Sequence, residues 1–310
     1  MTAIDWQAEI SAAAARIEGH VMRTPVATRH GFGLDRSVAL KFEHMQHTGS
    51  FKLRGAFNSI LSAPPPAAGL VAASGGNHGA AVAFAARALG YRARIFVPEL
   101  AGPAKIELIK AAGAELTVVP GAYADAAKLA AECAAETGAA QIHPFDAVPT
   151  VAGQGTVTRE WEEQGLDADT VLIAVGGGGL IAGAMAWLNG RRKVVAVEPE
   201  LAPTLNHALR DGPDTAVSVG GAAANALGAR QIGRICYDLA MAQDTLSLTV
   251  DEAAIAAAHR MLWQELRQYV EPAAAVALAA LTSGAYRPAE GERVAVLICG
   301  ANPAASPFSA

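Results

Sequence analysis

The stretch Val171-Leu-Ile-Ala-Val-Gly-Gly-Gly-Gly-Leu-Ile-Ala-Gly183 decides the fold. Its first five residues form a short apolar run that predicts a buried strand, and its last residues predict the start of a helix. The four glycines between them would present bare amide hydrogens at a helix N-terminus, where the helix dipole also attracts an anion. We interpret Gly176, Gly177, Gly178 and Gly179 as a phosphate-binding cup. The alternative is a flexible turn that needs positive φ angles.

Other readings of the same stretch differ in how well they fit. The turn lacks the Gly-Lys-Ser/Thr ending of a nucleotide-triphosphate P-loop. A dinucleotide fingerprint stays open at this point, because Gly177, Gly179 and Ala182 fit its loose form and Glu198 ends the next predicted strand. The uncharged run 171–188 is just long enough to suggest a membrane span, but the glycines in its middle argue against one.

Outward from this stretch, short apolar runs alternate with longer Ala-rich segments at helical spacing. This alternation predicts an α/β protein in which helices cover mostly parallel sheets. The predicted strands are 38–42, 70–73, 94–97, 116–119, 171–175, 194–198 and 294–299. The predicted helices are 6–18, 78–89, 103–112, 123–137, 151–164, 180–189 and 251–269.

Two breaks in the chain predict two lobes. The first is Pro64-Pro65-Pro66 followed by Gly69, and the second is His143-Pro144. We therefore expect residues 69–146 to form a small inserted domain and residues 1–68 with 147–310 to form a large one. A chain of 310 residues is long enough for both.

The composition excludes several classes of protein. Hydrophobic residues make up 52% and charged residues 17%, so most of the chain is expected to be ordered. A net charge of −5 without a basic run argues against nucleic acid and anionic membranes as partners. Three separated cysteines support neither a disulfide framework nor a zinc site. The N-terminus has no secretory pattern, so we expect a cytoplasmic protein.

A second glycine turn, Ala73-Ser74-Gly75-Gly76-Asn77-His78-Gly79, also follows a predicted strand and opens a predicted helix. It combines amides with a hydroxyl, a carboxamide and an imidazole, a set suited to binding a carboxylate or a phenolic oxygen. Taken alone, His78 fits a plain residue at a helix start equally well. Two such turns predict a ligand with two anionic ends.

A third segment, Gln46-His-Thr-Gly-Ser-Phe-Lys-Leu-Arg-Gly55, carries a lysine between two apolar residues. Partial desolvation would lower the pKa of Lys52 and free its amine to act as a nucleophile or a base. Most isolated lysines are solvated surface charges, but this one accompanies a phosphate cup and a polar glycine turn. Together these are the parts that hold pyridoxal phosphate as a Schiff base.

On these residues the sequence resembles the serine/threonine dehydratase family, which shares the fold-type II architecture of the tryptophan synthase β subunit. The resemblance covers nearly the whole chain and argues against the dinucleotide reading, since a hydride-transfer enzyme has no need of the lysine segment. The segments that carry it are 41–56, 74–79, 143–156, 176–183, 198–199, 271–272 and 299–302. It implies two lobes, each with a mostly parallel twisted sheet flanked by helices.

The resemblance also implies roles for single residues. Lys52 matches the lysine that binds the cofactor and then acts as the base at Cα, and Phe51 matches the aromatic residue on the cofactor ring. Asn77 matches the contact of the ring 3′-oxygen, and Cys299 matches the position facing the pyridine nitrogen. The phosphate cup corresponds to Gly176, Gly177, Gly178, Gly179 and Leu180, and the substrate-carboxylate loop to Ser74, Gly75, Gly76 and His78.

The implied reaction is an α,β-elimination that converts L-threonine, L-serine or a phenylserine to a 2-keto acid and ammonia. A thiol at Cys299 does not hold a proton on the ring nitrogen, which favours elimination over long-lived carbanions. A racemase of the same fold is the alternative, but similar racemases carry a serine acid/base where this chain has Gly75. A cofactor-binding protein without turnover is a third reading, against which the presence of Lys52 argues.

Three further expectations follow from the resemblance. Metal-binding members carry an aspartate where this chain has Thr204 after Glu198, so we expect no metal and no sensitivity to a chelator. A homodimer is the usual assembly of similar proteins. The chain ends shortly after Asn302, so an effector-binding regulatory domain is not expected.

Overall fold

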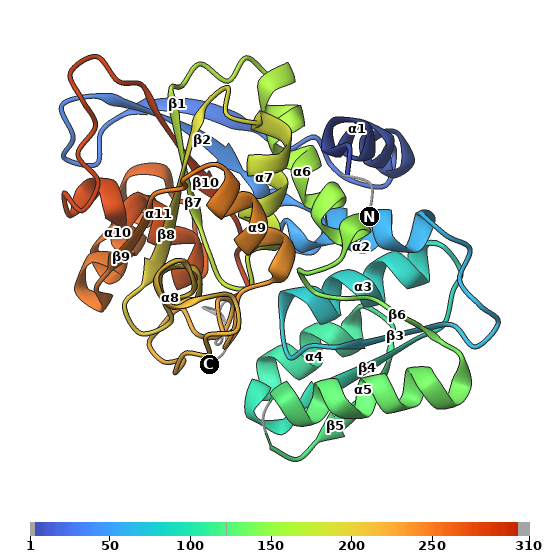
Figure 1. The fold of residues 1–310 in the computed structure, drawn as a ribbon. Helices are drawn as coiled ribbons and strands as arrows, with labels where there is room; N and C mark the ends of the chain where they lie inside the picture. The colour runs from blue at the N-terminus through green and yellow to red at the C-terminus, as the bar shows by residue number, and fades with distance from the viewer. Residues whose placement is uncertain (1–3, 122, 303–310) are drawn as a thin grey trace.

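The computed structural model describes residues 4–121 and 123–302. Two α/β lobes, each built on its own sheet, lie side by side (Figure 1). Within these residues the larger sheet has six strands in the order β1-β2-β10-β7-β8-β9, and the smaller has four in the order β5-β4-β3-β6. All neighbours pair in parallel except β1 and β2, which are antiparallel. This confirms the predicted α/β class with mostly parallel sheets.

The strands of the larger sheet are β1 (Val26–His30), β2 (Ser37–Phe42), β10 (Val294–Ile298), β7 (Thr170–Ala174), β8 (Lys193–Pro199) and β9 (Ser247–Val250). Those of the smaller sheet are β5 (Glu115–Val119), β4 (Ala93–Pro98), β3 (Leu70–Ala73) and β6 (Ala140–Gln141). Every predicted strand overlaps one of these. The central strands β7 and β10 are buried at every residue, which is why their sequences are continuous apolar runs.

The helices are α1 (Trp6–Ile17), α2 (Lys52–Leu61), α3 (Asn77–Ala88), α4 (Pro103–Ala111), α5 (Tyr123–Thr137), α6 (Val148–Glu163), α7 (Gly179–Leu188), α8 (Thr204–Asp211), α9 (Arg234–Ala242), α10 (Glu252–Leu266) and α11 (Pro272–Thr282). Two short 3₁₀ turns, η1 (Glu43–Met45) and η2 (Glu99–Ala101), complete the set. The predicted helix 251–269 extends too far, because Arg267 adopts a left-handed φ of 55° and ends α10.

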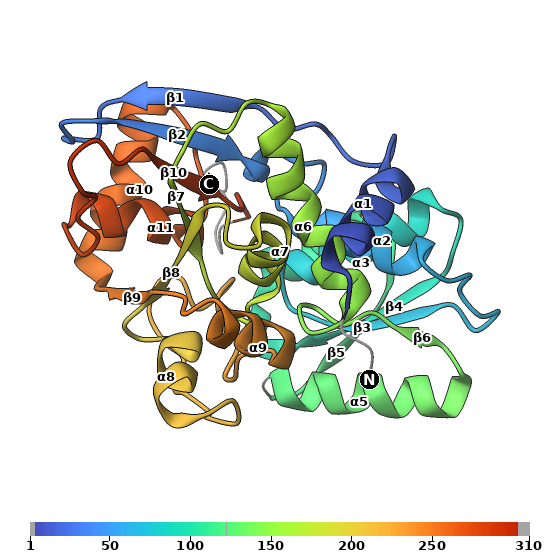
Figure 2. The same cartoon turned by 45° about the horizontal axis from the view of Figure 1, so that its top comes forward.

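Helices cover both sheets. Helices α6 and α7 lie between the larger sheet and the smaller lobe, whereas α10 and α11 lie on the far side (Figure 1). Helix α1 packs on α6 where the lobes meet (Figure 2). The core of the smaller lobe includes Leu53, Phe57 and Ile60 of α2, although α2 precedes residue 69. The division at residues 69 and 146 stays a prediction.

Candidate active site

The predicted phosphate cup is a tight turn between β7 and α7. Gly178 has a φ of 90°, in the left-handed region that favours glycine. The N–H of Ala182 donates to the carbonyl of Gly178 at 2.9 Å, so the amides ahead of Ala182 lie before the helical hydrogen-bond ladder. A Cβ on Gly178 would lie 2.6 Å from the Cys236 sulfur, and one on Gly177 would overlap the Phe145 ring. Only glycine therefore fits the turn.

Lys52 is the first residue of α2, which follows β2 and the turn after that strand. Its Nζ donates to the carbonyl of Pro144 at 2.8 Å and lies 5.2 Å from the centroid of the Phe51 ring. Burial lowers the pKa of Lys52 to about 8, against the opposing influence of Cys299 and Glu271. The neutral, nucleophilic form of this amine is therefore a minor fraction near physiological pH, but a far larger one than in a solvated lysine.

The second glycine turn lies between β3 and α3. Ser74 Oγ accepts a hydrogen bond from the Gly76 N–H at 3.1 Å. His78 Nε2 lies 2.9 Å from the carbonyl of Ile142, and burial lowers its pKa to about 3, so the ring is neutral and donates through Nε2. The Nε2 of His78 is therefore already engaged with the main chain.

Asn77 lies at the centre of a polar chain that joins the lobes. Its Nδ2 donates to Glu271 Oε1 at 2.8 Å, and its Oδ1 accepts from Asn302 Nδ2 at 2.9 Å. Burial raises the pKa of Glu271 to about 7. The sequence assigned a role to Asn77 but none to Glu271. The only sign of Glu271 in the sequence was that Glu271-Pro272 is one of the segments that carry the family resemblance.

Cys299 follows β10 and is buried. Its carbonyl accepts a hydrogen bond from the Phe51 N–H at 3.1 Å, which fixes the two predicted segments against each other. Burial raises the pKa of the Cys299 thiol, so the sulfur carries its proton and no charge. This is the neutral group that the sequence interpretation requires at this position.

The predicted residues gather at the carboxyl-terminal ends of parallel strands from both sheets, where α/β proteins bind ligands. Residues Pro144 and Phe145 join them: the carbonyl of Pro144 binds Lys52, and Phe145 packs against Gly177 and Gly179. Leu180 is buried in the first turn of α7. Phe145 was not among the predicted site residues, although it lies within the matching segment 143–156.

Glu198 and Thr204 occupy the place considered for a metal. Thr204 Oγ1 lies 2.6 Å from the carbonyl of Gly176 and 3.0 Å from Glu198 Oε1. The amides of Leu205 and Asn206 each donate to Glu198 at 2.7 Å, so its carboxyl group caps α8. Burial raises the pKa of Glu198 to about 7 despite these hydrogen bonds. The described residues hold no group of three His, Cys, Asp or Glu side chains placed to bind a metal.

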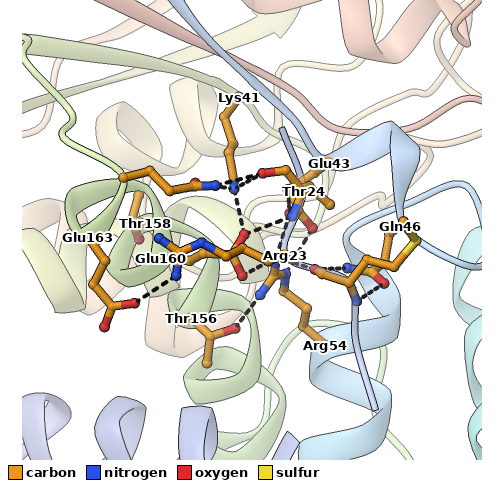
Figure 3. Close-up of polar contacts among 12 residues, drawn as sticks. Arg23, Thr24, Lys41, Glu43, Gln46, Arg54, Thr156, Thr158, Glu160 and Glu163 are labelled. Atoms are coloured by element: carbon orange, nitrogen blue, oxygen red, sulfur yellow. Dashed lines mark hydrogen bonds and ion pairs between the residues drawn. The ribbon is translucent and has the colours of Figure 1, made fainter. Parts of the chain in front are cut away.

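A buried ion network around Arg54 supports the first turn of α2 (Figure 3). Arg54 binds Glu43 through two hydrogen bonds of 2.9 and 2.7 Å and Glu160 through one of 2.9 Å. Lys41 binds Glu160 at 2.5 Å and the carbonyl of Thr24 at 2.9 Å. Two cations and two carboxylates thus neutralise one another in the interior. Removing any one of them would leave a buried charge without one of its partners and destabilise the fold.

The residues fit pyridoxal phosphate. A glycine cradle that a Cβ would fill can bind the phosphate, and a buried amine with a pKa of about 8 can react with the aldehyde. Asn77 and Cys299 are placed on the elements that surround both groups. The two turns are also consistent with the expected ligand having two anionic ends.

Comparisons with known proteins agree with this assignment. The profile of the family described as "Pyridoxal-phosphate dependent enzyme" matches residues 17–300. Phenylserine dehydratase of Ralstonia pickettii is 34% identical over 302 residues, covering 95% of this chain and 92% of that protein. L-threonine ammonia-lyase of Thermotoga maritima is 35% identical over 270 residues, covering 86% and 67% of the two chains.

Solved structures give the same result. A threonine deaminase from the organism abbreviated T.th. superposes with a TM-score of 0.88 at 35% identity, covering 97% of this chain and 99% of that one. Maize serine racemase has a TM-score of 0.87 at 30% identity, with 96% and 93% covered. Among the described helices, none has both the length and the apolar character needed to cross a membrane. The chain belongs to the pyridoxal-phosphate-dependent enzymes of the serine/threonine dehydratase family.

Proposed function

We propose that the protein is a dehydratase that converts an L-3-hydroxy amino acid, such as L-threonine, L-serine or L-threo-3-phenylserine, to a 2-keto acid and ammonia. The names of its relatives support this substrate class, since they include a phenylserine dehydratase and threonine ammonia-lyases. The observation that carries the choice of reaction is at Gly75. A Cβ there would lie 2.5 Å from the Cβ of Ala101, so the loop has no room for a side chain with an acidic or basic group.

The absence of a side chain at residue 75 distinguishes elimination from racemisation. Racemisation needs a proton donor on the face of Cα opposite the base, and Gly75 cannot supply one. Elimination needs a base on one face alone, and Lys52 is that base. Its lowered pKa lets the amine accept the Cα proton near neutral pH and release it again.

When bound, pyridoxal phosphate supplies an electron sink that acidifies the Cα proton of the amino acid. Gly176 to Gly179 would hold the phosphate through their amides, and Asn77 would contact the ring oxygen. The neutral thiol of Cys299 would not hold a proton on the ring nitrogen. Lys52 takes the proton from Cα, the Cα–Cβ double bond forms, and hydroxide leaves Cβ. Addition of water to the released enamine gives the 2-keto acid and ammonia.

The test is to incubate the cofactor-loaded protein with L-serine, L-threonine, L-threo-3-phenylserine and D-serine in parallel. Release of 2-keto acid and formation of the opposite enantiomer are measured in each reaction. We expect 2-keto acid from at least one L-substrate, at a rate well above enantiomer formation. A racemisation rate above the rate of 2-keto acid release would replace the dehydratase with the racemase.

Three wider expectations belong to the same proposal. We propose a homodimer located in the cytoplasm, supported by the usual assembly of similar proteins and by three free cysteines, which suit a reducing compartment. We also propose that residues 69–146 form the small domain, supported by the placement of β3 to β6 within this range. Light scattering coupled to size-exclusion chromatography measures the assembly. A monomer at micromolar concentration would contradict the dimer.

A further inference from the structure

Lys105 is a buried cation that the proposed reaction leaves without a role. It lies in the first turn of α4 in the smaller lobe and is only 4% exposed. Its Nζ donates to the backbone carbonyl of Asn225 at 2.6 Å, in the connection between α8 and α9 of the larger lobe. Lys105 therefore crosses from one lobe to the other beside the candidate active site.

The ammonium of Lys105 is incompletely paired. Among the described residues, no carboxylate forms an ion pair or a side-chain hydrogen bond with its Nζ, and the carbonyl of Asn225 is the hydrogen-bond acceptor found for it. An ammonium has three donors, and a buried charge is costly unless it is paired. Burial lowers the pKa of Lys105, whereas the charge of Glu271 opposes that shift without forming an ion pair. An anionic ligand would complete the environment of this cation.

The position of Lys105 identifies where that ligand would lie. A Cβ placed on Gly76 would be 3.3 Å from Lys105 Nζ and 3.6 Å from the carbonyl oxygen of Asn225. The bare backbone of Gly76 thus faces the ammonium directly. Gly76 also caps α3, a helix of 12 residues whose N-terminal amides favour an anion. The cation and the helix terminus converge on one loop, Ser74 to His78.

Space for a ligand exists next to this point. A cavity of about 220 Å³ is lined by Asn225, Glu271 and Asn302, among other residues. Asn225 accepts the Lys105 hydrogen bond, and Glu271 is the acid whose charge acts on Lys105. The cavity therefore borders the same lobe-crossing contacts.

We propose that Lys105 is a substrate-binding residue whose ammonium recognises the α-carboxylate of the amino acid at the Ser74–His78 loop. This inference rests on the proposed function, because the α-carboxylate is the one anion common to all the candidate substrates. It adds to the loop a formal positive charge, which backbone amides and neutral side chains do not supply. A role limited to joining the lobes through Asn225 is the competing explanation.

The experiment separates the effect of the Lys105 charge from the effect of its hydrogen bond to the carbonyl of Asn225. Lys105→Met removes both, whereas Lys105→Gln removes the charge but keeps a donor for the carbonyl of Asn225. Lys110→Met is the matched control, because Lys110 lies on the same helix but is exposed and paired with Glu107 at 2.8 Å. Two readouts are taken: KM and kcat with the best L-substrate, and calorimetric binding of propionate and propionamide. Neither of these two probes has an amine that could react with the cofactor.

We expect both Lys105 variants to raise KM and the Kd for propionate by about 10- to 100-fold, the range for a charged hydrogen bond. The kcat should change less than about threefold, and propionamide binding and the Lys110→Met variant should match the wild type. Wild-type affinity for propionate in Lys105→Gln, or no propionate binding to the wild type, overturns the inference. If Lys105→Met does not fold, Lys105→Gln decides alone.

The propionate readout also keeps the two proposals apart. It needs no turnover, so it decides the role of Lys105 even if no 3-hydroxy amino acid yields a 2-keto acid. Conversely, turnover with unchanged propionate binding in Lys105→Gln keeps the dehydratase and removes Lys105 from the substrate site.

Discussion

The guanidinium of Arg54 binds the carboxylate of Glu43 through two parallel hydrogen bonds in the protein interior, two residues after Lys52. Glu43 begins η1, directly after β2, and Arg54 lies in α2, so the pair fixes the helix to the larger sheet. Because the first residue of α2 is Lys52, the same pair also fixes the position of the backbone that carries the reactive amine.

Arg54→Met should lower the free energy of unfolding by about 3–5 kcal/mol, because it leaves Glu43 buried without its main partner. Urea unfolding followed by circular dichroism measures this change. The control is Arg94→Met, which breaks the exposed Arg94–Glu115 pair and should cost less than about 1 kcal/mol. Equal effects of the two variants would show that burial of the Arg54–Glu43 pair is unimportant.

Gly178→Ala should weaken cofactor binding by about tenfold or more. The new Cβ would lie 2.6 Å from the Cys236 sulfur at a φ of 90°, so the cup would have to open. Gly190→Ala is the control at the opposite end of α7, where φ is 75° but no atom lies within 4 Å of the added Cβ. It should cost about 1 kcal/mol of stability and leave cofactor affinity unchanged. Titration of the apoprotein with pyridoxal phosphate tests both variants.

Covalent uptake of the cofactor should depend on pH with a midpoint near the Lys52 pKa of about 8. The amine reacts only when neutral, so the rate should rise through pH 8, where it reaches half its maximum, and level off only at clearly higher pH. Stopped-flow absorbance from pH 6 to 10 measures the rate constant. A midpoint near 10.5, the value of a solvated lysine, would mean that burial does not activate Lys52.

Incubation with a chelator should change neither 2-keto acid release nor the thermal midpoint. Thr204 already connects Gly176 to Glu198 by hydrogen bonds, so the cup has support that needs no cation. Thr204→Val should instead lower the free energy of unfolding by about 1–3 kcal/mol, because the hydroxyl that lies between the buried carbonyl of Gly176 and Glu198 Oε1 is lost. Loss of activity on chelation, restored by Mg²⁺ or Ca²⁺, would contradict this account.

Much of the fold follows from local sequence patterns. Buried parallel strands such as β7 are continuous apolar runs, and helices such as α1 carry amphipathic spacing, so both types were predictable. Helix α11 was missed because it is buried on almost all sides, which removes the polar face that marks a helix. Strand β1 was missed for the opposite reason, since all five of its residues are exposed and show no alternation. Helices α2, α8 and α9 and the short strands β6 and β9 were missed as well.

The candidate site was predictable where it depends on contiguous motifs. Glycine turns and the lysine segment each carry their chemistry within a few residues. Partners far apart in sequence were not predictable: Glu271 meets Asn77 across 194 positions, and Lys105 meets Asn225 across 120. Such pairs depend on how the two lobes pack, which no local pattern encodes.

The most direct test of the central claim compares 2-keto acid release by the wild type and Lys52→Ala, both supplied with pyridoxal phosphate and the best L-3-hydroxy amino acid. We expect steady release by the wild type. In Lys52→Ala we expect a loss of at least three orders of magnitude, because no other described residue is assigned as base or cofactor anchor. Retained turnover in Lys52→Ala would contradict the assignment of Lys52 and the mechanism built on it.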